Sequence, residues 1–412
     1  MGKSIKRFLR TIFYILIALV VLFNVFVVLS GRYYLYTGVY QTYLQGRMGP
    51  GIYDLDKFHY RKMESSQHPK PWEYSKAYNT KSPSKADLAY MKSLGTTAFL
   101  VIKDDKIVYE YYNDIASKTK VSNAFSATKT VVALMIGIAL DEGKIKSLDE
   151  KIGVYLPEFK TKGREKITIR HLLEMASGLD WEESGKNPLS ENAESYYGTD
   201  LYGLVTRQHV VSEPGKVFNY QSGNTQLLGF VLQKATGKSV SDYCRTKILE
   251  PLGMESDAYW SLDKADGDEK SFCCFYATAR DYAKLGKLLL NDGIVDGKRI
   301  VSERFIHEAK QPADIRTEEG WKNLRYGLHL WVYFDPQATV HYFRGLKGQY
   351  IITVPDEKLI IVRLGHERDK NYLIPEGKMK NRGFIKRHLN KVEHSIDVFR
   401  YLNIGRQLVS KK

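Results

Sequence analysis

The chain has 412 residues, which is enough for two ordinary domains or for one large enzyme with an inserted lobe. Hydrophobic residues make up 43% of it and charged residues 26%, so the composition supports a buried core and excludes a globally disordered chain. The 62 lysines and arginines outnumber the 47 aspartates and glutamates, and the resulting net charge of +15 favours contact with anionic surfaces.

The chain contains only three cysteines: Cys244, Cys273 and Cys274. They are too few for a disulfide framework or a four-cysteine zinc site, and there is no H-E-x-x-H or C-x-x-C pattern. We therefore predict no metal site and no cofactor. Three pairings of the cysteines stay open: free thiols, a bond between the two adjacent residues, or a bond to Cys244.

The first thirty residues predict a membrane-spanning helix. An apolar run over residues 11–30 follows four cations: Lys3, Lys6, Arg7 and Arg10. Twenty helical residues span about 30 Å, the thickness of the hydrocarbon core of a bilayer. Cations next to a span stay in the cytoplasm, so residues 1–10 form a cytoplasmic tail. We predict a single-pass membrane protein with an extracytoplasmic body, which argues against nucleic acid as a partner.

A cleaved signal peptide is the alternative interpretation of this segment. Val28 and Ser30 before Gly31 resemble a cleavage site. Because the apolar region of a signal peptide usually has only about 7–15 residues, we favour the uncleaved anchor. Residues 31–85 are rich in tyrosine and show no sustained period, so we interpret them as a partly ordered connector.

Residues 86–412 predict one α+β domain. Two β-branched and aromatic runs, 97–102 and 107–112, flank a polar turn, and three further strands are expected late in the chain, at 339–343, 350–354 and 359–364. Mostly helical stretches lie between the two groups. We expect one antiparallel sheet that joins both groups, a helical lobe inserted over about residues 145–325, and a closing helix over 392–402 that covers one face of the sheet.

One S-x-x-K pattern stands out by its context. Ser126 and Lys129 begin a segment that is apolar nearly all round through residue 140, and a helix of that kind is buried. The same pattern at Ser82, Ser117 and Ser261 lies in polar stretches. Residues three apart share a helix face, so the Lys129 amine can reach the Ser126 hydroxyl. The alternative is a helix-capping serine followed by a lysine that reaches solvent.

Burial makes Lys129 a candidate general base. Removal from water lowers a lysine pKa from about 10.4 towards the value of about 7–8 that suits a general base. A neutral Lys129 then takes the proton of Ser126 and creates a nucleophile, while the Ser126 N–H offers a donor to an oxyanion. Two more segments add candidate site residues. Tyr220 lies beside a predicted helix start, although it could instead be a core aromatic. Gly345 lies in a strand that the substrate backbone could approach closely, although it could instead mark a bulge.

In their order and spacing, four phrases resemble the serine β-lactamase-like family: FSATKT at 125–130, ITIRHLLEMASGLDW at 167–181, PGKVFNYQSGNTQLLG at 214–229 and RGLKGQYI at 344–351. This family includes class C β-lactamases, D-alanyl-D-alanine peptidases, esterases and 6-aminohexanoate-dimer hydrolases. The resemblance covers about residues 90–402. It implies a β-lactamase/transpeptidase-like fold in which the site lies between the sheet domain and the helical lobe.

Carried over by position, the resemblance implies that Ser126 is the nucleophile, Lys129 the base and Tyr220 the proton relay to the leaving group. The N–H groups of Ser126 and Leu346 would form the oxyanion hole. Two departures concern the substrate. An asparagine of the lactamase relatives is replaced by Ser222, as in the esterase and amide-hydrolase branches. The usual Lys-Thr-Gly strand reads Phe343-Arg344-Gly345, which leaves Arg344 or Lys347 to supply a charge.

We therefore predict a membrane-anchored, exported serine hydrolase that cleaves a small amide or ester through an acyl-enzyme. The substrate-binding candidates are Ser222, Arg344, Gly345 and Lys347. A D-alanyl-D-alanine carboxypeptidase or β-lactamase is the first alternative, although it needs a carboxylate clamp that the sequence does not provide. The second is a non-catalytic module that binds wall polymer or lipid, which would account for the net charge and for one basic run: Lys378, Lys380, Arg382, Lys386 and Arg387.

Overall fold

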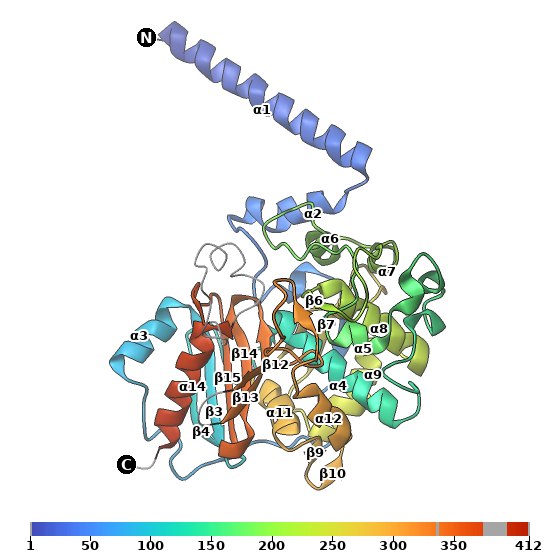
Figure 1. The fold of residues 1–412 in the computed structure, drawn as a ribbon. Helices are drawn as coiled ribbons and strands as arrows, with labels where there is room; N and C mark the ends of the chain where they lie inside the picture. Colours follow the sequence, from blue (N-terminus) through green and yellow to red (C-terminus); the bar gives the residue numbers. More distant parts are fainter. Residues whose placement is uncertain (1, 335–337, 374–393, 411–412) are drawn as a thin grey trace.

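The computed structural model describes residues 2–334, 338–373 and 394–410. Its main sheet has the strand order β12-β13-β14-β15-β3-β4-β2, and all neighbours are antiparallel except β2, which is parallel to β4 (Figure 1). The strands are β2 (Glu73–Tyr74), β3 (Thr96–Lys103), β4 (Lys106–Tyr112), β12 (Trp331–Phe334), β13 (Thr339–Gly345), β14 (Gln349–Val354) and β15 (Leu359–Gly365). The prediction that the early and late strands join in one sheet is confirmed.

Helices cover both faces of this sheet, which explains why β15 is buried along its whole length. On one face, Gly286 of α11 (Ala279–Leu290) lies against Ile360, and on the other, Gly405 of α14 (Ile396–Val409) lies against Ile361 (Figure 1). At Gly405 an added Cβ would lie 2.3 Å from Ile361 Cδ1, so the close approach of α14 requires a glycine. The closing helix therefore exists, but it begins at Ile396 and continues to Val409; residues 392–393 of the predicted segment lie outside the described residues.

The helical lobe lies between β4 and β12 in the sequence. Its central pair consists of α4 (Thr128–Asp141) and α8 (Ser222–Thr236), which pack against each other. The shorter helices around them are α5 (Ile169–Leu173), α6 (Glu191–Tyr197), α7 (Leu201–Thr206), α9 (Val240–Cys244), α10 (Glu250–Leu252) and α12 (Glu303–Ala309). The α+β fold with an inserted, mostly helical lobe is confirmed.

A second sheet was not predicted. It has the order β1-β7-β8-β5, and its strands are β1 (Tyr60–Met63), β5 (Ser122–Asn123), β7 (Ala258–Ser261) and β8 (Phe275–Ala277). Its strand β1 comes from the Tyr-rich connector, which also contributes β2, α2 (Tyr34–Gln41) and the short 3-10 turns Tyr43–Gln45 and Leu55–Lys57. The connector is therefore more regular than its sequence pattern indicates, because its short elements pair with distant strands.

The N-terminal helix α1 (Gly2–Ser30) projects from the body of the protein (Figure 1). Over Ser4–Ser30 it is long and apolar enough to cross a membrane, a test that a signal sequence also passes. Its side chains are largely exposed, which is the opposite of what a soluble core helix shows.

Candidate active site

Ser126 lies in a tight turn that leads into α4. The 3-10 turn η3 (Phe125–Ala127) directly precedes the helix, and Phe125 has a φ of 46°, in the left-handed region. The side chain of Asn123 supports the turn, because its Oδ1 accepts the N–H of Phe125 at 2.7 Å. One helical turn later, Lys129 Nζ donates a hydrogen bond to Ser126 Oγ at 3.1 Å. The serine and lysine therefore meet as their spacing predicts.

The Lys129 side chain is enclosed by the helical lobe. Only 1% of the residue is exposed, and Nζ also donates to Ser222 Oγ at 3.0 Å and to the carbonyl of Phe272 at 2.8 Å. All three of these acceptors are uncharged at neutral pH. Burial therefore lowers the pKa of Lys129 from 10.5 to about 8, although the charge of Glu183 partly opposes the shift. The amine is thus prepared to give and take a proton near neutral pH.

Tyr220 completes the cluster from the residues just before α8. Its ring lies 5.2 Å from Lys129 Nζ and packs against Tyr326 and Trp331, with ring centroids 5.9 Å apart in both cases. Burial raises the pKa of Tyr220 and the charge of Glu183 adds to this, whereas a hydrogen bond with Ser126 and the charge of Arg344 act in the opposite direction. Tyr220 therefore keeps its proton at neutral pH.

Glu183 is the residue of this cluster that the sequence did not reveal. Its Oε1 accepts the Ser222 hydroxyl at 2.6 Å, and its Oε2 accepts the Ser222 N–H at 2.7 Å. The indole N–H of Trp181 donates to the same Oε2 at 2.8 Å. A continuous hydrogen-bonded chain therefore runs from Ser126 through Lys129 and Ser222 to a carboxylate at the start of α8, where the helix dipole also favours negative charge.

Trp181 is held against α8 by the absence of a side chain at Gly223. A Cβ at this position would lie 2.5 Å from the indole ring, so glycine is needed for the ring to pack where it does. The two adjacent glutamates directly after Trp181, Glu182 and Glu183, were a possible signal for a carboxylate near the site. Nothing in the local sequence, however, distinguishes Glu183, which turns inward, from the exposed Glu182.

The end of β13 brings another group of predicted residues beside the Ser126 turn. An added Cβ at Gly345 would lie 2.0 Å from the carbonyl oxygen of Ala124, so this strand and η3 approach each other through glycine. Leu346 follows at once, and its side chain is half exposed. The guanidinium of Arg344 lies 4.7 Å from the ring of Trp331, the residue that packs on Tyr220.

Lys347 is oriented by its backbone. It adopts a φ of 63° within the turn η8 (Leu346–Gly348), and its Nζ donates to the carbonyl of His366 at 3.2 Å. Of the two cations predicted to replace the missing lysine, Arg344 is therefore the one that packs in the aromatic cluster around Tyr220, whereas Lys347 contacts the segment after β15.

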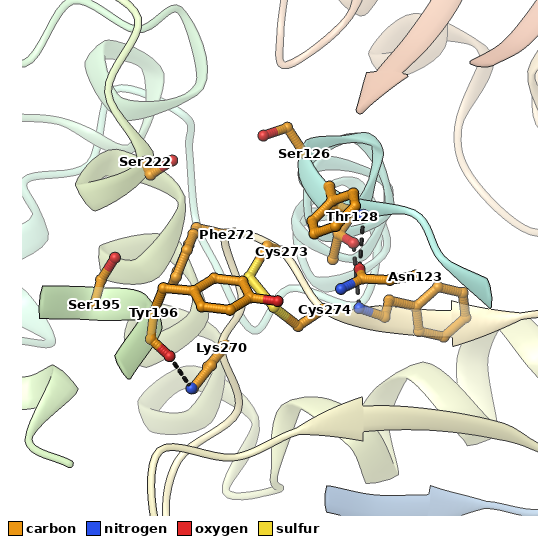
Figure 2. Close-up of a disulfide and its surroundings, with 12 residues drawn as sticks. Asn123, Ser126, Thr128, Ser195, Tyr196, Ser222, Lys270, Phe272, Cys273 and Cys274 are labelled. Atoms are coloured by element: carbon orange, nitrogen blue, oxygen red, sulfur yellow. Dashed lines mark hydrogen bonds between the residues drawn. A yellow bond between two sulfur atoms is a disulfide. The ribbon is translucent and has the colours of Figure 1, made fainter. Parts of the chain in front are cut away.

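A disulfide between adjacent cysteines lies directly behind the site. Cys273 and Cys274 are joined to each other, Cys244 is a buried free thiol, and the open question of pairing is thereby answered. Figure 2 shows the disulfide beside the start of α4, below Ser126. The two cysteines follow Phe272, whose carbonyl accepts a hydrogen bond from Lys129. The disulfide therefore constrains the backbone that positions one of the three acceptors of Lys129 Nζ.

Comparisons with known proteins identify the family. The model of the Beta-lactamase family matches residues 87–371, more than half of the chain. The 6-aminohexanoate-dimer hydrolase of Paenarthrobacter ureafaciens is 24% identical over 291 residues, which cover 65% of this chain and 72% of that protein.

Two solved structures show the same fold. A candidate 6-aminohexanoate-dimer hydrolase from Bacillus anthracis has a TM-score of 0.70 and 21% identity, covering 87% of this chain and 93% of the other. A family VIII carboxylesterase has a TM-score of 0.60 and 17% identity, covering 82% of this chain and 99% of the other. The chain belongs to the Beta-lactamase family and is a serine hydrolase.

Proposed function

We propose that this protein is a membrane-anchored, extracytoplasmic hydrolase that cleaves a small amide or ester through an acyl-enzyme on Ser126. One observation carries the proposal: a fully buried Lys129 that contacts the Ser126 hydroxyl and has a pKa of about 8. About one molecule in ten then has a neutral lysine at pH 7, which is enough for general-base catalysis.

In the first step, Ser126 Oγ attacks the substrate carbonyl while its proton passes to the neutral amine of Lys129. The ammonium that forms is held by Ser222 Oγ and by the Phe272 carbonyl. The negative oxygen of the tetrahedral intermediate accepts the N–H groups of Ser126 and Leu346. Each such donor contributes about 10²–10³ to the rate.

The second step expels the leaving group, an amine or an alcohol, which must take a proton as its bond to the carbonyl carbon breaks. Tyr220 donates this proton and recovers one from the Lys129 ammonium 5.2 Å from its ring. Water then attacks the acyl-enzyme, gives a proton back through the same groups, and releases the acid and free Ser126.

The residues around the nucleophile favour a linear amide or an ester over a β-lactam. The position of the carboxylate-binding lysine is occupied by Phe343, and the neighbouring Arg344 packs on Trp331. Ser222 is engaged on both sides, by Lys129 and by Glu183, so we assign it to the positioning of the base as well as to the substrate side of the site. The names of the relatives, a 6-aminohexanoate-dimer hydrolase and a carboxylesterase, support this choice. Gly345 and Lys347 remain candidate substrate contacts.

The membrane part of the proposal depends on α1. Its exposed apolar surface has no cover within the described residues of this chain, and the four leading cations favour a cytoplasmic N-terminus. The basic run predicted for a wall- or lipid-binding module, residues 378–387, lies outside the described residues. A hydrogen-bonded Ser126, Lys129 and Tyr220 cluster favours the enzyme over that module.

The test is covalent labelling of the purified protein with a serine-directed fluorophosphonate, followed by mass spectrometry of the intact chain. Ser126→Ala should abolish both labelling and ester turnover. Ser117→Ala is the matched control, because Ser117 belongs to the same S-x-x-K pattern in an exposed loop. Full activity of Ser126→Ala would refute the assignment, and rapid acylation by a penicillin in the same assay would favour the β-lactamase or peptidase alternative.

A further inference from the structure

The corner between α1 and α2 is fixed to the body of the protein. Tyr34 donates its hydroxyl to the carbonyl of Pro188 at 3.0 Å, and Arg32 donates to the carbonyl of Leu189 at 2.7 Å. Tyr34 and Leu35 are buried, and α2 packs against α6. Because of these contacts, α1 leaves the body in one defined direction and is not attached by a loose tether (Figure 1).

The opposite side of α2 is apolar and exposed. Tyr33, Tyr36 and Tyr40 follow one another at the spacing of a helix face, and Tyr43 and Leu44 belong to the 3-10 turn after α2. These five side chains are between 38% and 71% exposed. We call this surface the outer face. A helix on a soluble domain normally presents charged residues to water, but the outer face has none, and no aspartate or glutamate occurs in residues 1–53.

We propose that the outer face lies on the surface of the bilayer that α1 crosses, and that it holds the catalytic site against the membrane. The inference rests on the anchoring described under the proposed function. Tyrosine is enriched at the level of the lipid headgroups, where its ring is buried and its hydroxyl is hydrated. The outer face is continuous with α1 through Tyr36, whose hydroxyl donates to Asn24 at 2.8 Å. A bilayer that α1 crosses would therefore lie beside this face.

The same corner is linked to the active site by a short loop. Pro188 and Leu189, which accept hydrogen bonds from Tyr34 and Arg32, are five and six residues from Glu183, which binds Ser222 in the site. Five residues span at most about 18 Å, so the backbone of Glu183 lies within that distance of Pro188. The loop is internally braced, because Ser190 Oγ donates to the carbonyl of Ser184 at 2.8 Å.

A second segment links the corner to the nucleophile. The connector leaves the outer face and reaches Ile52, whose carbonyl accepts the N–H of Asn123, three residues before Ser126, at 2.8 Å. Two segments therefore connect the corner between α1 and α2 to the site: the loop that carries Glu183 and the connector that carries Ile52. This arrangement suits a substrate whose ester or amide is carried at the bilayer surface by an acyl chain, because such a molecule meets the site without leaving the membrane.

The first experiment measures where the outer face lies, without any need for activity. Full-length protein with Tyr40→Trp is inserted into phosphatidylcholine vesicles with and without brominated acyl chains. Lys298→Trp is the matched control, since β10 (Lys298–Arg299) lies at the end of the body opposite α1 (Figure 1). After subtraction of the parent emission, the Tyr40→Trp signal should fall at least about twofold on bromination, and the control should not change.

The outcomes separate this inference from the proposed function. If the protein floats with the vesicles but the Tyr40→Trp emission does not respond, the outer face is not on the membrane and the inference is overturned, while the anchor stands. If the protein does not float with them, the anchor and the inference both fail. Since the measurement works equally well on a Ser126→Ala background, neither outcome changes the hydrolase assignment.

The second experiment tests the consequence for the substrate. A triple variant, Tyr33→Ser, Tyr40→Ser and Tyr43→Ser, removes most of the outer face without touching the buried side of α2. Hydrolysis of a long-chain nitrophenyl ester held in vesicles should fall at least about tenfold, whereas hydrolysis of water-soluble nitrophenyl acetate should not change. If the triple variant hydrolyses both esters at the rate of the parent, or loses the same factor on both, the substrate does not reach the site from the bilayer.

Discussion

The charge of Glu183 should set the pH range in which Lys129 acts as a base. Glu183→Gln removes that charge and keeps the size of the side chain. Because the carboxylate raises the pKa of Lys129, its loss should lower this pKa below about 8. The acylation rate rises with pH as Lys129 loses its proton, and we call this rise the acidic limb of the pH profile. In Glu183→Gln the limb should therefore move to lower pH.

The structure gives the size of this shift. Lys129 Nζ lies 3.0 Å from Ser222 Oγ, which lies 2.6 Å from Glu183 Oε1. The two charges are therefore at most about 5.6 Å apart, and their attraction is about 3 kcal/mol at an effective dielectric constant of about 20 and about 0.7 kcal/mol in bulk water. At about 1.36 kcal/mol per pH unit, the limb should move by about half a unit to two units.

The assay is the pH dependence of the rate at which a fluorophosphonate labels Ser126. Glu182→Gln is the matched control, because this neighbouring glutamate is exposed and hydrogen-bonds Asn187. The control should leave the limb in place. A limb that does not move in Glu183→Gln, or that moves to higher pH, would show that the carboxylate does not act on Lys129 as described.

Three further substitutions test the burial of Lys129, the packing of Trp181 and the role of Tyr220. Lys129 is protonated up to about pH 10.5 in the unfolded chain but only up to about pH 8 in the folded protein, so the stability of the wild type should rise between these pH values. Lys129→Met lacks this titration. The free energy of unfolding in urea, measured for Lys129→Met minus wild type, should therefore fall by about 3 kcal/mol between about pH 7 and pH 10.5. Gly223→Ala should collide with Trp181 and lower the free energy of unfolding by about 1–3 kcal/mol, whereas Gly185→Ala, with open space around its Cβ, should not. Tyr220→Phe should slow hydrolysis of an anilide by about 10²–10⁴ and that of a nitrophenyl ester much less, because only the amine needs a proton to leave; equal losses on both would argue against the proton relay.

Part of the site was predictable because it depends on local patterns. The apolar segment after Ser126 indicates a buried helix, and burial together with an i, i+3 spacing is sufficient to bring Lys129 to the serine. Tyr220 was predicted to lie beside a helix start, and α8 does begin at Ser222. Five strands of the main sheet, β3, β4, β13, β14 and β15, were equally accessible, since each has six residues or more and is rich in β-branched or aromatic side chains. The short strands β2 and β12, with two and four residues, were not predicted.

The parts that were missed depend on contacts between distant segments. Strand β5 has two residues and pairs with β8 about 150 positions later, so no periodicity develops in either. The Phe272 carbonyl is a backbone group, and side-chain chemistry gives no indication of it. Glu183 and Glu182 have the same chemistry, and the contacts that hold Glu183 inward come from Trp181 and from Ser222, 39 residues later in the chain.

The hydrolase mechanism depends on a Lys129 amine that begins to lose its proton near neutral pH, and titration of lysine side-chain nitrogens by NMR measures this directly. Protein labelled with ¹⁵N-lysine is compared with Lys129→Met, so that the signal missing from the variant identifies Lys129 Nζ. This signal should titrate with a pKa of about 8. A pKa near the ordinary lysine value of about 10.4 would contradict it, because the ammonium would then have no capacity to accept the proton of Ser126 at neutral pH.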